Sequence, residues 1–148
     1  MITKIQVKNY RSLGEINLNL GQLTVLVGPN GSGKSNLIDV LRFVAEVLQY
    51  GLDAALTKRH GIDMLRRWSL KKPYDLCMEF EINNQKKDHL FEATYGFELK
   101  SERDSKISVK KEYCLIKWKN QTAEYQYEKG VPVKPVSTGL SPQVDADS

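Results

Sequence analysis

Cysteine is scarce in this chain, and a long apolar run is absent. Cys77 and Cys114 are the two cysteines among 148 residues, and neither has a second cysteine at metal-ligand spacing. This excludes a disulfide scaffold or a cysteine-based zinc site and favours reduced, buried thiols. No stretch approaches the roughly 18 apolar residues of a spanning helix, and the first eight residues alternate instead of forming a signal peptide. We therefore expect a cytoplasmic protein without a membrane partner.

The chain also lacks a strong charge imbalance. Its 22 lysines and arginines against 18 acidic residues leave a net charge of +4, which neither requires nor excludes contact with DNA or RNA. A hydrophobic content of 41% is typical of a globular protein. The length suits about one domain that can bury a core without disulfides.

Apolar residues alternate with polar ones in two early stretches. Ile5 and Val7 belong to the first, and Ile16, Leu18 and Leu20 to the second, which predicts two half-buried strands joined through residues 11–14. The continuous apolar run of residues 23–27 then predicts a strand buried on both faces, ending at Gly28.

From Lys34 to about Tyr50 the apolar residues recur at helical spacing, and polar residues form only a narrow stripe. A helix that is apolar over most of its circumference packs against a sheet and is covered by something else as well. We therefore expect an internal helix directly after the Gly28 loop.

The rest of the chain divides into three further segments. Residues 53–74 are predicted to be irregularly helical, broken at Gly61, with a basic cluster of Lys58, Arg59, His60, Arg66, Arg67, Lys71 and Lys72. Residues 75–136 contain successive strand-like stretches without helices between them, which predicts an antiparallel β lobe. Residues 137–148 are expected to be a loop or tail. Residues 1–52 then form the predicted α/β core.

One motif carries specific chemistry. Residues 28–35, Gly-Pro-Asn-Gly-Ser-Gly-Lys-Ser, have the spacing of a Walker A phosphate-binding loop and lie between a predicted strand and a predicted helix. Glycines let successive backbone N–H groups approach phosphate oxygens, and the helix N-terminus adds unpaired N–H groups. The alternative is a plain turn that joins a strand to a helix.

The residue types at this loop suit a nucleoside triphosphate. Lys34 is predicted to stabilise charge on the β and γ phosphates, and the hydroxyl of Ser35 to be offered to Mg²⁺. We therefore predict binding of ATP with Mg²⁺. The expected binding residues in and beside the loop are Asn30, Gly31, Ser32, Gly33, Lys34, Ser35 and Asn36.

The sequence Gly-Pro-Asn-Gly-Ser-Gly-Lys-Ser-Asn, preceded by Val-Lys-Asn-Tyr-Arg-Ser-Leu, resembles the start of the SMC, RecF and ABC-like ATPase heads. The segment Gly-Leu-Asp-Ala-Ala-Leu-Thr-Lys-Arg extends the likeness to AAA-type ATPases of the RecF-like group. The resemblance implies an ABC-type head with a P-loop NTPase core (strand, P-loop, helix) and an adjoining antiparallel β lobe. It also implies that two heads clamp two ATP molecules in a homodimer, and that Arg11 and Ser12 approach the nucleotide.

The catalytic half of that pattern is missing. The family has an apolar strand ending in Asp-Glu, which binds Mg²⁺ and positions water, and no such strand occurs here. Residues 140–143 lack the glycines of the family's signature, and His60 and His89 precede the place of its switch histidine and are expected at the surface. We therefore expect the N-terminal part of a longer ATPase, with little or no turnover alone.

Three alternatives stay open. A P-loop GTPase would need a base-reading motif that residues 85–88 miss at their first position, and a small-molecule kinase would continue with alternating strands and helices. A nucleotide-responsive module could instead bind DNA or RNA through the basic cluster, without turnover. A solvated basic face is favoured, because Trp68 is the only stacking aromatic within it.

Overall fold

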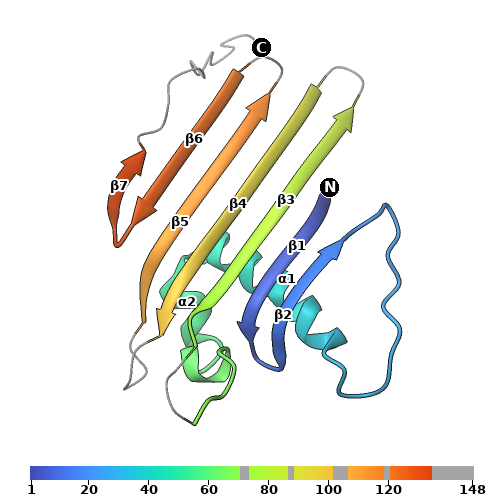
Figure 1. Cartoon of the computed structure of the whole chain (residues 1–148), viewed down its shortest axis with the longest axis vertical. Helices are drawn as coiled ribbons and strands as arrows, with labels where there is room; N and C mark the ends of the chain where they lie inside the picture. The colour runs from blue at the N-terminus through green and yellow to red at the C-terminus, as the bar shows by residue number, and fades with distance from the viewer. Residues whose placement is uncertain (71–73, 87–88, 102–106, 119–120, 135–148) are drawn as a thin grey trace.

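The protein is a single antiparallel sheet with helices on one face (Figure 1). A computed structural model describes residues 1–70, 74–86, 89–101, 107–118 and 121–134. The seven strands lie in the order β2-β1-β3-β4-β5-β6-β7. Their bounds are β1 Ile2–Tyr10, β2 Leu13–Asn19, β3 Leu76–Lys86, β4 His89–Ser101, β5 Ile107–Trp118, β6 Gln121–Glu128 and β7 Val131–Lys134.

Strand β1 joins the N-terminal hairpin to the later strands. It pairs with β2 on one side, with Val7 opposite Ile16, and with β3 on the other, with Val7 opposite Met78. Strands β3 to β7 then follow as an antiparallel meander. The predicted hairpin and the predicted meander are therefore confirmed, and they share one sheet.

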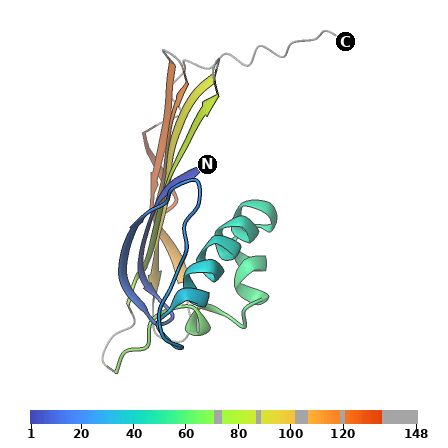
Figure 2. The ribbon, with the colours of Figure 1, turned by 90° about the vertical axis from the view of Figure 1, so that its right-hand side faces the viewer.

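Helix α1 spans Lys34–Tyr50 and lies across the β1 to β4 part of the sheet. Figure 2 shows that all the helices cover the same face of the sheet. The helix buries Leu37, Val40, Phe43 and Val44, whose spacing places them on the side toward the sheet. Fully burying one side chain of this size contributes roughly 1.5–3 kcal/mol. The predicted helix is confirmed with the bounds expected for it.

The opposite side of α1 has no cover among the described residues. Ile38 and Leu48 are exposed, as is Ala45 between them, and these positions follow one helical stripe. The prediction of an internal helix is therefore wrong for the described residues, because this stripe of α1 faces away from the sheet and no described residue buries it.

The strand predicted for residues 23–27 is absent from the structure. The segment is extended but pairs with no described strand, and Leu23, Val25 and Val27 are 85%, 71% and 88% exposed. The prediction was wrong for a physical reason: an apolar run is buried on both faces only when neighbouring strands pair with both of its edges. The strand just before this segment, β2, pairs with β1 and not with residues 23–27.

Residues after α1 form short helical turns, as expected. Helix α2 spans Leu52–Thr57, and a 3-10 helix, η1, spans Ile62–Met64. Gly61 separates them with a φ of 93°, a left-handed conformation that favours glycine. Among the described helices, none combines the length and apolar character needed to span a membrane.

The two cysteines are free thiols, as expected, although each is only half-buried. Burial raises the pKa of Cys77 to about 11, and nearby Glu98 adds to the effect. Burial also raises the pKa of Cys114. Raised pKa values keep both sulfurs protonated at neutral pH, so neither is a reactive thiolate.

Candidate functional site

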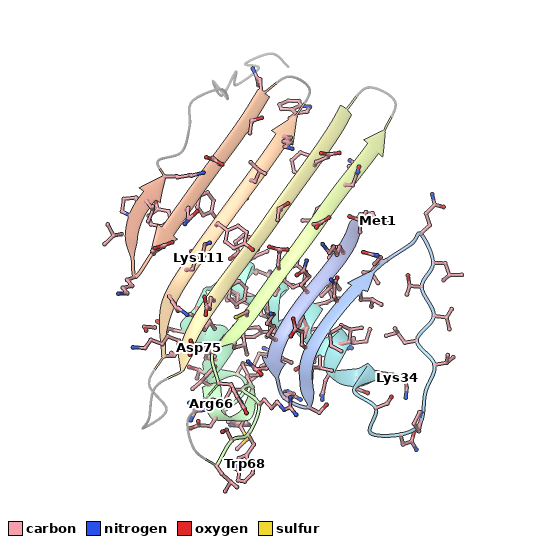
Figure 3. The ribbon with its side chains drawn as sticks, in the orientation of Figure 1. Met1, Lys34, Arg66, Trp68, Asp75 and Lys111 are labelled. Atoms are coloured by element: carbon pink, nitrogen blue, oxygen red, sulfur yellow. The ribbon has the colours of Figure 1, made fainter. Side chains whose placement is uncertain are left out.

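The loop of residues 28–35 leads directly into the first turn of α1 (Figure 3). The ammonium group of Lys34 folds back over this loop. Its Nζ donates hydrogen bonds to the carbonyl oxygens of Gly28 and Pro29, both at 2.7 Å, and to Oγ of Ser32 at 3.2 Å. The charged group is therefore held at the centre of the loop by neutral oxygens.

Two glycines give the loop a path that other residues resist. Gly31 has a φ of 81° and Gly33 a φ of 95°, both in the left-handed region. A Cβ on Gly33 would also lie 2.8 Å from Cδ2 of Leu13. Glycine at position 33 thus allows the left-handed backbone turn and also lets the loop approach Leu13 of β2 closely.

The seven predicted binding residues of the loop line one common cavity. Its volume is about 200 Å³, and its lining consists of Asn30, Gly31, Ser32, Gly33, Lys34, Ser35 and Asn36. Because α1 begins at Lys34, the unpaired N–H groups of its first turn lie at this cavity. The N-terminal end of a helix dipole also favours an anion there.

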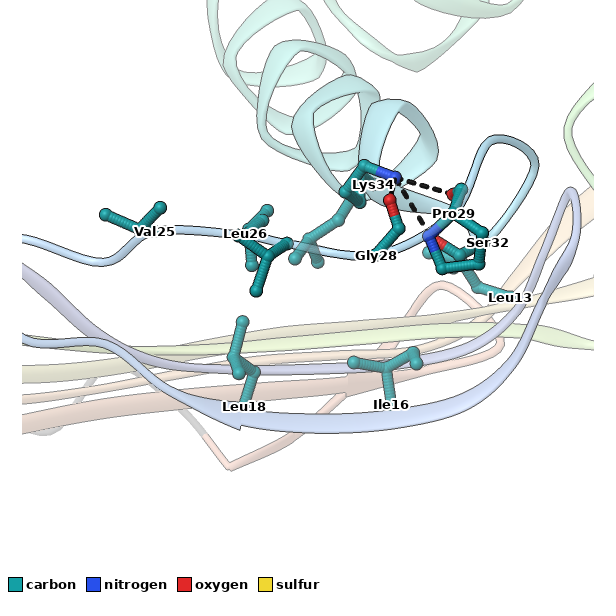
Figure 4. A pocket seen from close by; sticks show the side chains of 12 residues that line it. Leu13, Ile16, Leu18, Val25, Leu26, Gly28, Pro29, Ser32 and Lys34 are labelled. Atoms are coloured by element: carbon teal, nitrogen blue, oxygen red, sulfur yellow. Dashed lines mark hydrogen bonds between the residues drawn. The ribbon is translucent and has the colours of Figure 1, made fainter.

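A larger apolar cavity of about 460 Å³ lies beside the loop and β2 (Figure 4). Ile16 and Leu18 of β2 line one wall, and Val25 and Leu26 line the facing one. The loop residues Gly28, Ser32 and Lys34 close one end. Open space therefore lies between segment 23–27 and β2 beside the loop, while Leu26 packs against the core.

The turn between β1 and β2 lies against the first part of α1. Nδ2 of Asn36 donates a 2.7 Å hydrogen bond to Oγ of Ser12. The preceding residue, Arg11, forms an ion pair with Asp39, with 3.0 Å between its NH2 and the carboxylate Oδ2. The structure thus brings both residues of this turn, predicted from the resemblance, to the helix that begins at Lys34.

Asp39 is the centre of a charged network behind the loop. Tyr10 donates a 2.6 Å hydrogen bond to it, and Arg59 lies 3.4 Å away. Burial, and then the hydrogen bond to the carboxylate, raise the pKa of Tyr10 well above its ordinary value. Burial disfavours the charged Arg59, but its bond to Glu46 and the charge of Asp39 outweigh this and raise its pKa.

The basic cluster presents less free charge than its sequence indicates. Lys58 and Arg59 both pair with Glu46, and the Arg59 side chain is only 9% exposed. Arg66 pairs with Asp63. Trp68 is exposed at the lower end of the molecule in Figure 3, and His60 is at the surface, as expected. Residues 71–73, the side chain of His89 and residues 135–148 lie outside the described part.

Sequence reasoning missed Tyr10 and Asp39. Asp39 was visible only as a member of the polar stripe of the predicted helix, and Tyr10 only as part of the segment Val-Lys-Asn-Tyr-Arg-Ser-Leu. One signal was available: Asp39 follows Asn36 by three positions, so both lie on the same face of the helix. Which segment would meet that face required the tertiary structure.

Comparison with protein families gives one match over most of the chain. Residues 1–134 match the AAA ATPase domain family. A shorter match, 48% identical over 44 residues, links 30% of this chain to 8% of an OLD nuclease from Thermus scotoductus. The chromosome partition protein Smc of Methanocaldococcus jannaschii is 46% identical over 44 residues, covering 29% of this chain and 4% of that protein.

A third relative is the DNA replication and repair protein RecF of Corynebacterium jeikeium, 36% identical over 61 residues. That match covers 39% of this chain and 14% of the relative. Each matched segment therefore spans no more than 14% of these three relatives.

A solved structure shares the fold. It comes from work on the ATP-driven dimerization and DNA-stimulated activation of SMC ATPases. The TM-score is 0.50 at 22% sequence identity, over 82% of this chain and 71% of that one.

Proposed function

The chain belongs to the AAA ATPase domain family and is similar to the Smc and RecF proteins, and we propose that it binds Mg-ATP through residues 28–36. One observation carries the proposal: Asn30 to Asn36 line a single cavity at the N-terminus of α1, with the Lys34 ammonium folded over the loop beside it. A polyphosphate suits a site made of helix N–H groups, flexible glycine backbone and one mobile cation.

Lys34 is the residue proposed to stabilise phosphate charge. Its three present contacts are with two carbonyl oxygens and one hydroxyl, all neutral. A phosphate oxygen carries a full negative charge, so it attracts the ammonium more strongly than the dipole of a neutral carbonyl or hydroxyl does. Phosphate oxygens should therefore displace the loop carbonyls as partners of Nζ, which releases the loop to close around the anion.

Ser35 is the proposed protein ligand of Mg²⁺. It follows Lys34 in the first turn of α1, lines the same cavity and is exposed. No group of three or more His, Cys, Asp or Glu side chains among the described residues could hold a metal ion. One hydroxyl together with phosphate and water oxygens nevertheless suits Mg²⁺, which usually retains several waters. When bound, the ion neutralises charge on the phosphates.

Arg11 and Ser12 are proposed to contact the bound nucleotide from the β1–β2 turn. Ser12 lies beside the loop, because a Cβ on Gly33 would come within 3.6 Å of its Oγ. A guanidinium group next to a phosphate site can bind two phosphate oxygens at once.

We also propose that hydrolysis needs groups from outside these 148 residues. The exposed stripe of α1 and the exposed side chains of Leu23, Val25 and Val27 both leave apolar area in water, which is unfavourable. A C-terminal part of the ATPase head, with an apolar strand ending in Asp-Glu, would cover this surface and pair with segment 23–27. A complete head would then act as a homodimer with ATP between the two copies.

Calorimetric titration with Mg-ATP tests the proposed site. We expect Lys34→Ala to weaken ATP binding by about tenfold or more, because it removes a charge-assisted contact worth roughly 1.5–3 kcal/mol. Lys134→Ala on β7 is the matched control, since it removes a lysine at the far edge of the sheet. Equal affinities for the parent and Lys34→Ala would refute the assignment of the site.

A further inference from the structure

Asp39 connects the β1–β2 turn to the helix of the proposed nucleotide site. Its Oδ2 accepts the 2.6 Å hydrogen bond from the Tyr10 hydroxyl and lies 3.0 Å from NH2 of Arg11. Two consecutive residues of β1 and its turn thus meet one carboxylate oxygen on α1.

The inner side of this carboxylate is fixed by buried groups. Tyr10 is fully buried, and Arg59, whose NH2 lies 3.4 Å from Oδ1 of Asp39, is 9% exposed. The Arg59 guanidinium also lies over the ring of Phe43, 5.2 Å from its centroid, and pairs with Glu46. Asp39 is therefore held from within, independently of Arg11.

Arg11 is the outward partner of Asp39. Its side chain is 38% exposed, so its outer side is open to a ligand. Its backbone is held in a left-handed conformation, with a φ of 49°, by a 2.6 Å hydrogen bond from its N–H to the carbonyl of Leu65. The next residue, Ser12, is bound to Asn36 and lies beside Gly33. The chain neighbour of Arg11 thus lies beside the loop, and the guanidinium of Arg11 is held by Asp39.

We propose that Asp39 is a positioning residue that orients the Arg11 guanidinium toward the phosphates of a nucleotide bound at residues 28–36. The inference rests on the function proposed above and adds a residue that does not itself touch the nucleotide. A guanidinium held by one carboxylate loses less conformational freedom when it binds a phosphate. The carboxylate of Asp39 is itself fixed in place by its contacts with Tyr10 and Arg59.

A purely electrostatic role predicts the opposite sign. Asp39→Asn removes a negative charge near the proposed phosphate site, and the change in Coulomb energy alone would tighten the binding of an anion. Positioning predicts weaker binding, because Arg11 loses its orientation. The direction of the change therefore separates the two roles.

The test is a double-mutant cycle of Asp39→Asn and Arg11→Ala, read by calorimetric titration with Mg-ATP. We expect Asp39→Asn to weaken ATP binding by about fivefold in the parent chain, and by less than about twofold when Arg11 is already alanine. Asp39→Glu, which keeps the charge, should recover part of the affinity. Tighter binding by Asp39→Asn, or an equal loss in both backgrounds, would overturn the positioning role.

Two measurements keep the outcome interpretable. Circular dichroism and thermal unfolding establish that each variant is folded. If Asp39→Asn does not fold, Asp39→Glu replaces it in the cycle, and a smaller loss of ATP affinity is expected. If the parent chain does not bind Mg-ATP, the proposed function and this inference fail together. If the parent binds Mg-ATP and Lys34→Ala does not, but the cycle shows no coupling, only the role of Asp39 is overturned.

Discussion

The side chain of Leu13 lies against Gly33, so that a Cβ added to Gly33 would come within 2.8 Å of Cδ2 of Leu13. Leu13 is a buried residue at the start of β2, and Gly33 is the N-cap of α1. This contact joins the hydrophobic core to the loop and leaves no room for a side chain in the loop at that point.

The first prediction concerns Gly33→Ala. An alanine there must adopt a left-handed backbone, which costs roughly 1–2 kcal/mol, and must also displace Leu13 from the core. We expect the free energy of unfolding to fall by about 2–3 kcal/mol and ATP binding to be lost. Urea unfolding and calorimetry measure the two effects.

Gly31→Ala is the matched control for that experiment. Gly31 also has a left-handed φ, of 81°, but a Cβ there would meet no atom within 4 Å. The backbone cost should therefore appear alone, as a loss of about 1–2 kcal/mol. Equal losses of stability in the two variants would show that the contact with Leu13 contributes nothing.

The second prediction concerns Tyr10 and alkaline pH. Burial and the hydrogen bond to Asp39 raise the pKa of the folded Tyr10 well above the value of about 10 in an unfolded chain. Below pH 10 both states are protonated, so the contribution of Tyr10 to stability is intact. As pH rises above 10, only the unfolded state ionises, and stability falls by up to about 1.4 kcal/mol per pH unit.

Tyr10→Phe should make that alkaline loss of stability shallower. Part of the slope will persist, because burial also raises the pKa values of Tyr95, Tyr113 and Tyr125, that of Tyr125 to about 12. Urea unfolding between about pH 9 and pH 11 measures the slope. Tyr50→Phe, which removes a hydroxyl at the exposed end of α1, is the matched control for the substitution. An identical slope in Tyr10→Phe would contradict the prediction.

The third prediction concerns the exposed segment 23–27. Val25 and Val27 are more than two-thirds exposed, and an unpaired apolar segment favours association between copies of the chain. The double variant Val25→Thr and Val27→Thr keeps the branched shape but adds hydroxyl groups. As the protein concentration rises, we expect the variant to associate less than the parent chain does. Light scattering measures it, and Val133→Thr on β7 is the control. Undiminished scattering by the double variant would show that this segment is not the cause.

Local patterns in the sequence determined much of the secondary structure. The two-residue period around Val7 and Ile16 predicted the N-terminal hairpin, and the helical spacing of Leu37, Val40 and Val44 predicted α1 with its correct bounds. These predictions succeeded because the period of apolar residues reflects which face of a strand or helix is buried. The assignment of residues 28–36 to ATP stays a prediction of the same kind, derived from a local motif.

Tertiary structure decided what depends on distant partners. Residues 23–27 are as apolar as a buried strand, yet Leu23, Val25 and Val27 are exposed and only Leu26 packs against the core, because burial requires neighbours that local sequence does not specify. In the same way, the polar stripe of α1 indicated only that Asp39 is not in the core. Its contacts with Tyr10 and Arg11 arise because the sheet brings the end of β1 and the β1–β2 turn to that face of the helix, and its contact with Arg59 arises because the segment after α2 returns there. The sequence alone determined the motif, the helix and most of the strands, whereas long-range packing determined which apolar run is buried and which side chains meet.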